Sequence, residues 1–130
     1  MEHLEKVKEI RSESFGRHCN CCQAVLMAFA KEMNMTEAEA ESLGQFFGGG
    51  MMHGSICGSL SGAFMVLGKM GFDRKTASDI LKKFREKHDT TQCVDLLTAS
   101  KNRGIAKKEH CDGLIFEVVE EIEKILENRE

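Results

Sequence analysis

The sequence predicts an all-α fold: a compact bundle of about five to seven helices around a central apolar, glycine-rich helix. Three observations predict it. The 130 residues include no proline, 42% of them are apolar, and the apolar residues recur at helical spacing between capping residues and glycines. A chain of this length and composition is typical of one globular domain, so residues 1–130 are expected to form a single helical, cysteine-rich domain.

Three helices are predicted in the N-terminal part of the chain. The first has an apolar stripe made of Leu4, Val7 and Ile10. Asn20 is a suitable N-cap for the second, which should run to about Met33. Its apolar stripe consists of Cys22, Val25, Leu26, Phe29 and Met33. Thr36 and Glu39 have the spacing of a capping box and should open the third helix.

The fourth helix, in "ICGSLSGAFMVLGKMG", is the predicted central helix, because it carries almost no charge and should be buried on most sides. Gly54, Gly58 and Gly62 recur every four residues and would let a neighbouring helix approach closely. Ala24 and Ala28 offer a matching small face on the second helix.

Three further helices complete the bundle. Asp73 caps one that runs to about Lys87, a short one starts near Thr91, and the loop "KNRG" precedes the last. The last helix has an apolar stripe made of Cys111, Ile115, Val118, Ile122 and Ile125. The stripes of the first and last helices predict a symmetric homodimer that buries them, although they can also pack within one chain.

Charge and hydropathy argue against two classes of partner. The net charge of −3, with both signs interspersed, leaves no basic face for nucleic acid. The N-terminus is acidic and amphipathic, unlike a signal peptide, and no apolar run reaches the ~18 residues of a membrane span. The expected location is the cytoplasm. Cysteines there are kept reduced, so the six in this chain should be ligands, redox groups or core residues.

The cysteines fall at informative places in the predicted helices. Cys21, Cys57 and Cys93 lie in or beside a first turn, and Cys111 is close to one. Free N–H groups at a helix start stabilise the thiolate, the form that binds metals and attacks disulfides. We therefore expect these four side chains to converge on one site. Cys22 belongs to an apolar stripe and is interpreted as a core residue.

Four segments of the chain, "NCCQAVLMAF", "FFGGGMMHGSICGSLSGAFMVLG", "QCVDLL" and "HCDGLIFEVVEEIEKIL", resemble the C_GCAxxG_C_C family of redox-active proteins. The resemblance assigns the family cysteines to Cys21, Cys57, Cys93 and Cys111. It assigns the family glycines to Gly48, Gly49, Gly50, Gly58 and Gly62, as loop and close-packing support. Cys22 and Ser59 depart from the pattern, which usually has alanine there. The family implies a redox or metal role, and a related domain occurs in split-Soret cytochromes, which carry haem and an iron–sulfur centre.

Covalent haem is excluded because C-x-x-C-H is absent. Four thiolates suit an iron–sulfur cluster, and zinc suits them less well because three of these cysteines are solitary. His18, His53 and His110 flank cysteines and leave a mixed Cys/His site open. The glycine-rich loop lacks the G-K-[ST] ending of a phosphate loop, so Gly48, Gly49 and Gly50 should instead end the third helix.

The sequence thus predicts a redox-active protein whose four cysteines bind an iron–sulfur cluster or other thiophilic metal for electron transfer, with Cys21 and Cys57 as redox residues. The redox partner protein is unidentified, and an enzymatic activity would be that of an oxidoreductase or electron carrier. One alternative is a metal-free thiol/disulfide protein with Cys21 as nucleophile. Weaker pairs for that chemistry are Cys19 with Cys22 (C-x-x-C) and Cys19 with Cys21. A non-redox helical binding module is the other alternative.

Overall fold

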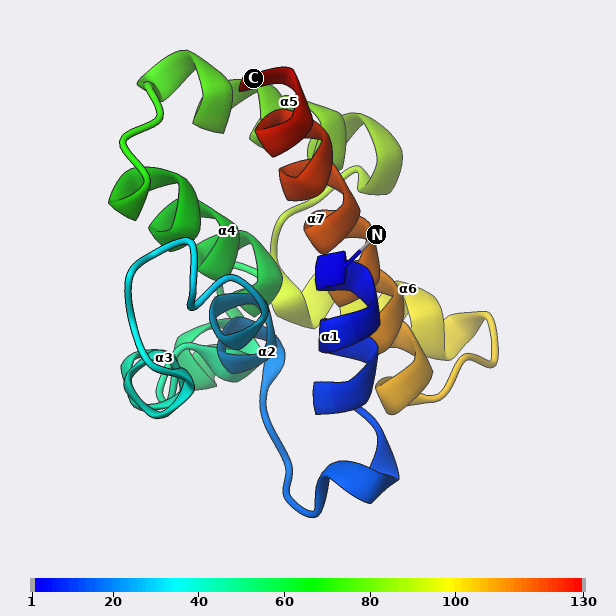
Figure 1. The fold of residues 1–130 in the computed structure, drawn as a ribbon. Helices are drawn as coiled ribbons and strands as arrows, with labels where there is room; N and C mark the ends of the chain where they lie inside the picture. Colours follow the sequence, from blue (N-terminus) through cyan, green and yellow to red (C-terminus); the bar gives the residue numbers. More distant parts are fainter. Residues whose placement is uncertain (1, 130) are drawn as a thin grey trace.

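A computed structural model describes residues 2–129, and the helices predicted from the sequence are all present in it (Figure 1). They are α1 (Glu2–Ile10), α2 (Cys21–Ala28), α3 (Glu37–Leu43), α4 (Gly58–Lys69), α5 (Arg74–His88), α6 (Cys93–Asn102) and α7 (Lys107–Arg129). A short 3-10 turn follows α1, and a π turn (Gly50–Gly54) precedes α4. The all-α prediction is confirmed.

The most deeply buried helix is α2, not α4, which the sequence predicted at the centre. Helix α2 contacts α1, α3, α4 and α7, and its side chains from Cys22 to Ala28 are all buried. Helix α4 packs against it with one face and exposes Phe64 on another. Most residues of α4 are nevertheless buried, against α2, α5 and α7, as its low charge predicted.

The predicted close approach at the glycine face is present between α4 and α2. A Cβ atom at Gly58 would lie 3.1 Å from Cys21 Cβ, and one at Gly62 would lie 2.9 Å from Val25 Cβ. Because neither position has room for a side chain, α4 can bring its first turn against that of α2. Gly54 lies before the helix and packs against Val94 instead.

Side-chain caps mark where α2, α3 and α5 begin. Asn20 forms a capping box with Gln23, and Thr36 forms one with Glu39. Helix α2 ends at Ala28, earlier than predicted, because the chain continues as tight turns that close at Asn34 with a φ of 59°. Phe29 and Met33 are nevertheless buried, as the apolar stripe requires.

The glycine-rich loop does not end α3, contrary to the prediction. Gly44 follows the last residue of α3, and the loop forms a separate turn in which Gly49, Gly50, Met51 and Met52 have left-handed backbone. Gly48 leaves room for the Asn20 side chain, whose Cβ would lie 2.3 Å from an added Cβ. The glycines thus hold the loop against the start of α2.

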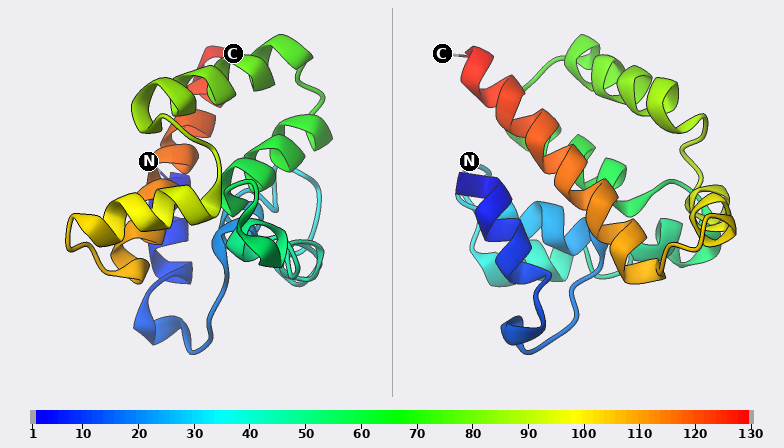
Figure 2. Two further views of the ribbon diagram at one scale, coloured as in Figure 1. Left: turned by 180° about the vertical axis from the view of Figure 1, so that it is seen from behind. Right: turned by 90° about the vertical axis from the view of Figure 1, so that its right-hand side faces the viewer.

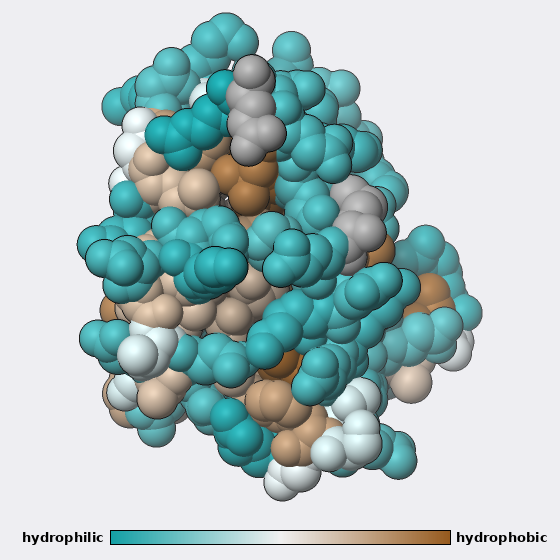
Figure 3. Space-filling model, viewed as in Figure 1, coloured by the Kyte–Doolittle hydropathy of each residue, from teal (hydrophilic) through white to brown (hydrophobic). Residues whose placement is uncertain are grey.

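The apolar stripes of α1 and α7 pack on each other, and the two helices lie side by side in both views of Figure 2. Val7, Ile10, Ile115, Val118 and Ile122 are buried within the chain. These stripes therefore pack within one chain, as the sequence allowed, and the homodimer stays a prediction. In Figure 3 hydrophilic residues cover most of the face that it shows. No helix within residues 2–129 is both long enough and apolar enough to cross a lipid bilayer.

Candidate functional site

A two-residue backbone bridge joins the segments that lead into α4 and α6. Ile56 and Gln92 pair in an antiparallel bridge. The N–H of Cys57 donates to the Thr91 carbonyl at 2.9 Å, and the N–H of Cys93 donates to the Ser55 carbonyl at 2.6 Å. The starts of α4 and α6, which are distant in sequence, are therefore fixed side by side.

The thiols of Cys21 and Cys111 lie close enough for a hydrogen bond between them to shift both of their pKa values. Cys21 is the first residue of α2, and α2 packs against α7. Cys111 lies one turn inside α7, which begins at Lys107, so it does not occupy the helix start that the sequence suggested for it. The contact between α2 and α7, rather than a shared position at helix starts, joins this pair.

The two thiols hold their protons with very different strength. The hydrogen bond from Cys21 lowers the pKa of Cys111 from 9.0 to about 7, although burial opposes it, and the charges of Arg11 and Lys107 lower it further. The same hydrogen bond, together with burial, raises the pKa of Cys21. Cys111 is therefore the thiol of the pair that ionises first, and Cys21 keeps its proton.

The other two family cysteines, Cys57 and Cys93, lie close enough for the charge of Cys111 to raise their pKa values. Burial raises the pKa of Cys57, and hydrogen bonds from Ser59 and from the backbone N–H of Leu60 oppose the rise. The Ser59 hydroxyl lies 3.0 Å from Cys57 Sγ. Ser59, which stands where the family usually has alanine, therefore makes a polar contact with a family cysteine. Burial, then the charges of Cys57 and Cys111, raise the pKa of Cys93.

Cys19 and Cys22 are both buried. Burial raises the pKa of Cys22 to about 12, and its side chain lies in the core, which confirms the interpretation from the sequence. Burial also raises the pKa of Cys19. Neither thiol has the ionised, accessible state that exchange chemistry needs, so this C-x-x-C pair is not a redox candidate.

A cavity of about 650 Å³ opens in front of the Cys21–Cys111 pair. Its lining includes the cysteines Cys19, Cys21, Cys93 and Cys111. Four basic side chains also line it: Arg11, Arg17, Lys107 and Lys108. Cys57 is buried and is not in the lining, so of the two predicted redox residues only Cys21 lines the cavity.

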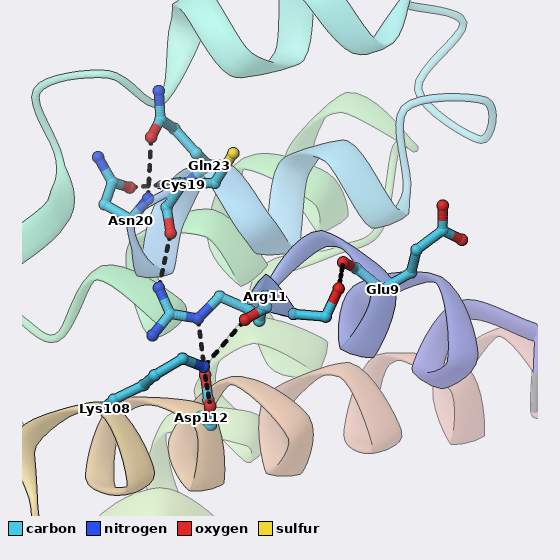
Figure 4. A network of polar contacts seen from close by, with 8 residues as sticks. Glu9, Arg11, Cys19, Asn20, Gln23, Lys108 and Asp112 are labelled. Atoms are coloured by element: carbon cyan, nitrogen blue, oxygen red, sulfur yellow. Dashed lines mark hydrogen bonds and ion pairs between the residues drawn. The ribbon is translucent and has the colours of Figure 1, made fainter. Parts of the chain in front are cut away.

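Arg11 is part of the cavity lining. Figure 4 shows the polar contacts that hold it. Its Nε donates to Asp112 Oδ1 and its NH1 group to the Cys19 carbonyl, both at 2.6 Å. Lys108 donates to the Arg11 carbonyl and to Asp112. This network ties the end of α1 to the segment before α2 and to the turn of α7 that carries Cys111. The sequence analysis missed Arg11, although its place four residues after Val7, on the buried face of α1, was a signal.

The predicted metal-binding group is not found in the part of the chain that the structure describes. Within residues 2–129, no group of three or more His, Cys, Asp or Glu side chains is arranged to hold a metal ion. The mixed Cys/His site therefore has no support either, and His110 Nδ1 instead lies 2.5 Å from the Ser100 hydroxyl.

Comparison with known proteins gives one match. The family model described as "Putative redox-active protein (C_GCAxxG_C_C)" matches residues 19–125, which include all six cysteines. No curated protein and no solved structure matches the chain. The resemblance found in the sequence is confirmed.

Proposed function

Because the chain belongs to the C_GCAxxG_C_C family, which is described as redox-active, we propose that it is a thiol–disulfide redox protein in which Cys21 and Cys111 form a reversible disulfide. The contact between these two thiols is the observation that carries the proposal. A disulfide requires two sulfurs about 2.05 Å apart, so forming it must bring these two neighbouring thiols closer together.

Cys111 is the attacking residue in this proposal, whereas the sequence favoured Cys21. A thiol with a pKa of about 7 is well suited to exchange near neutral pH. The Cys111 thiolate attacks one sulfur of a substrate disulfide, the substrate S–S bond breaks, and one thiolate leaves. Cys21 then loses its proton and attacks Cys111 Sγ, which releases the second thiolate. Two electrons pass from the protein dithiol to the substrate.

A thiol reductant must regenerate the dithiol after each cycle by the reverse exchange. The glutathione and thioredoxin pools of the cytoplasm supply such reductants. A cytoplasmic setting, as expected from the sequence, is therefore part of this proposal. Cys57 and Cys93 have raised pKa values and remain protonated beside the reacting pair.

Oxidation of the reduced protein with diamide, followed by peptide mapping with mass spectrometry, tests the proposal. We expect one dominant bridge between Cys21 and Cys111. It should be lost in Cys21→Ser and Cys111→Ser and kept in the control Cys93→Ser, which alters a thiol of the same cavity. Six thiols that stay unreactive at neutral pH would overturn the proposal and favour a non-redox binding module.

An iron–sulfur cluster bound by Cys21, Cys57, Cys93 and Cys111 is a second candidate, because the charges of these four thiols influence one another. A bound cluster would supply electron transfer. The side chains as arranged in residues 2–129 do not fit a metal ion, and zinc would need the same four sulfurs. Anaerobic expression and reconstitution test this candidate. The chain has no Trp or Tyr, so a cluster would dominate the near-ultraviolet spectrum, and a colourless protein free of iron and sulfide would exclude it.

A further inference from the structure

The cavity in front of Cys111 is basic, although the protein as a whole is acidic. Four side chains of its lining are Arg or Lys, and no Asp or Glu is among its lining residues. The chain carries a net charge of −3. The positive charge of the cavity is therefore local to the thiols and differs in sign from the net charge of the whole chain.

Part of this positive charge remains unpaired after the ion pairs are considered. Asp112 forms ion pairs with both Arg11 and Lys108, so two cations share one carboxylate. Arg17 is matched by Glu41. Lys107 has no ion-pair partner among the described residues, and its charge reaches Cys93 and Cys111. The wall around Cys111 therefore retains excess positive charge that an anionic ligand would complement.

The size and lining of the cavity limit what can reach Cys111. A volume of about 650 Å³ lies in the range of pockets for small molecules. Ile10, Val94 and Leu97 add apolar surface beside the cations. A molecule with carboxylates at its ends and an aliphatic centre that contains sulfur would match this lining.

We infer that the cavity binds a small disulfide that carries carboxylate groups, with Lys107 and the Arg11–Lys108 wall holding the carboxylates and Cys111 facing the sulfur. This inference rests on the proposed function and names its substrate class. The carboxylates take no part in bond making. The exchange itself is the balanced two-step reaction given above, in which the substrate disulfide is reduced to two thiols and the Cys21–Cys111 dithiol is oxidised.

Stopped-flow oxidation of the reduced protein by three small disulfides tests the inference. The probes are glutathione disulfide, which is a net anion, hydroxyethyl disulfide, which is neutral, and cystamine, which is a cation. Lys107→Gln should slow the reaction with glutathione disulfide about fivefold more than that with hydroxyethyl disulfide, and the reaction with cystamine should be slowed least. The ratio of the rates measured with different probes cancels any effect of Lys107→Gln on the reactivity of Cys111 that all probes share.

Lys82→Gln is the matched control, because it removes the same charge from an exposed position on α5 outside the cavity. It should leave all three rates within a factor of about two. Added salt should also narrow the difference between anionic and cationic probes in the unmodified protein. Equal slowing of all three probes by Lys107→Gln, with the Cys21–Cys111 bridge still formed by diamide, would overturn the inference alone. Absence of that bridge with every oxidant would overturn the proposed function as well.

Discussion

Cys21 in the first turn of α2 and Cys111 in the second turn of α7 lie close enough for each thiol to shift the pKa of the other. The contact joins the most deeply buried helix to the C-terminal helix. It also divides the roles of the two thiols, since the pKa of Cys111 is lowered and that of Cys21 is raised.

The rate of Cys111 alkylation should rise with pH through a midpoint of about 7, because only the thiolate reacts and the pKa of Cys111 is lowered to that value. Cys21→Ala removes the hydrogen-bond donor, so the midpoint should move up toward 9.0. Residue-resolved mass spectrometry after iodoacetamide pulses measures both. Cys93→Ala should leave the midpoint in place, and an unchanged midpoint in Cys21→Ala would contradict the assigned contact.

Oxidation should stabilise the protein. A Cys21–Cys111 bridge closes a long loop of the unfolded chain, which is worth about 4 kcal/mol in the chain-entropy description. Urea unfolding of the diamide-treated and the reduced protein measures the difference. In Cys21→Ser the two treatments should give the same midpoint, and a bridge that destabilises the unmodified protein would show that the pair is strained.

Arg11→Met should destabilise the protein by about 2 kcal/mol, because it leaves the Cys19 carbonyl without its buried donor and removes one of the two cations that face Asp112. Arg17→Met removes an exposed ion pair and should cost about 0.5 kcal/mol. Chemical denaturation compares them. Equal costs would mean that the Arg11 network does not fix the wall of the cavity.

Gly62→Ala should destabilise the contact between α2 and α4 by about 2 kcal/mol, because the added Cβ would lie 2.9 Å from Val25 Cβ and 3.3 Å from the Cys22 carbonyl oxygen. Gly68→Ala, on the same helix, meets nothing within 4 Å and should stabilise it by about 0.5 kcal/mol. Thermal unfolding of the two variants gives the sign of each effect, and a neutral Gly62→Ala would argue against the close packing.

Local signals in the sequence were sufficient for the helices. The capping boxes at Asn20 and Thr36 and the cap at Asp73 fixed three helix starts, because these contacts form between residues close in the chain. The end of α2 and the conformation of the glycine-rich loop were harder to predict from the sequence, since both depend on tertiary packing. Gly48 is required by the side chain of Asn20, which no local pattern reveals.

The candidate site could be predicted only in part for the same reason. Motif and helix position identified the four family cysteines, but which two are in contact depends on the packing of α2 against α7. The roles of Cys21 and Cys111 depend on Arg11 and Lys107, which come from different parts of the chain. We expected all four thiols to meet at one point and form a metal-binding group. Within residues 2–129 the packing of the helices does not arrange them in that way.

Equilibration of the protein in buffers of reduced and oxidised dithiothreitol, with the Cys21–Cys111 bridge quantified by mass spectrometry at each ratio, tests the central claim most directly. We predict one two-electron transition, fully reversible, in which this bridge alone forms and disappears. A bridge between other cysteines, or thiols that never pair at any ratio, would contradict the claim that Cys21 and Cys111 are the redox pair of this protein.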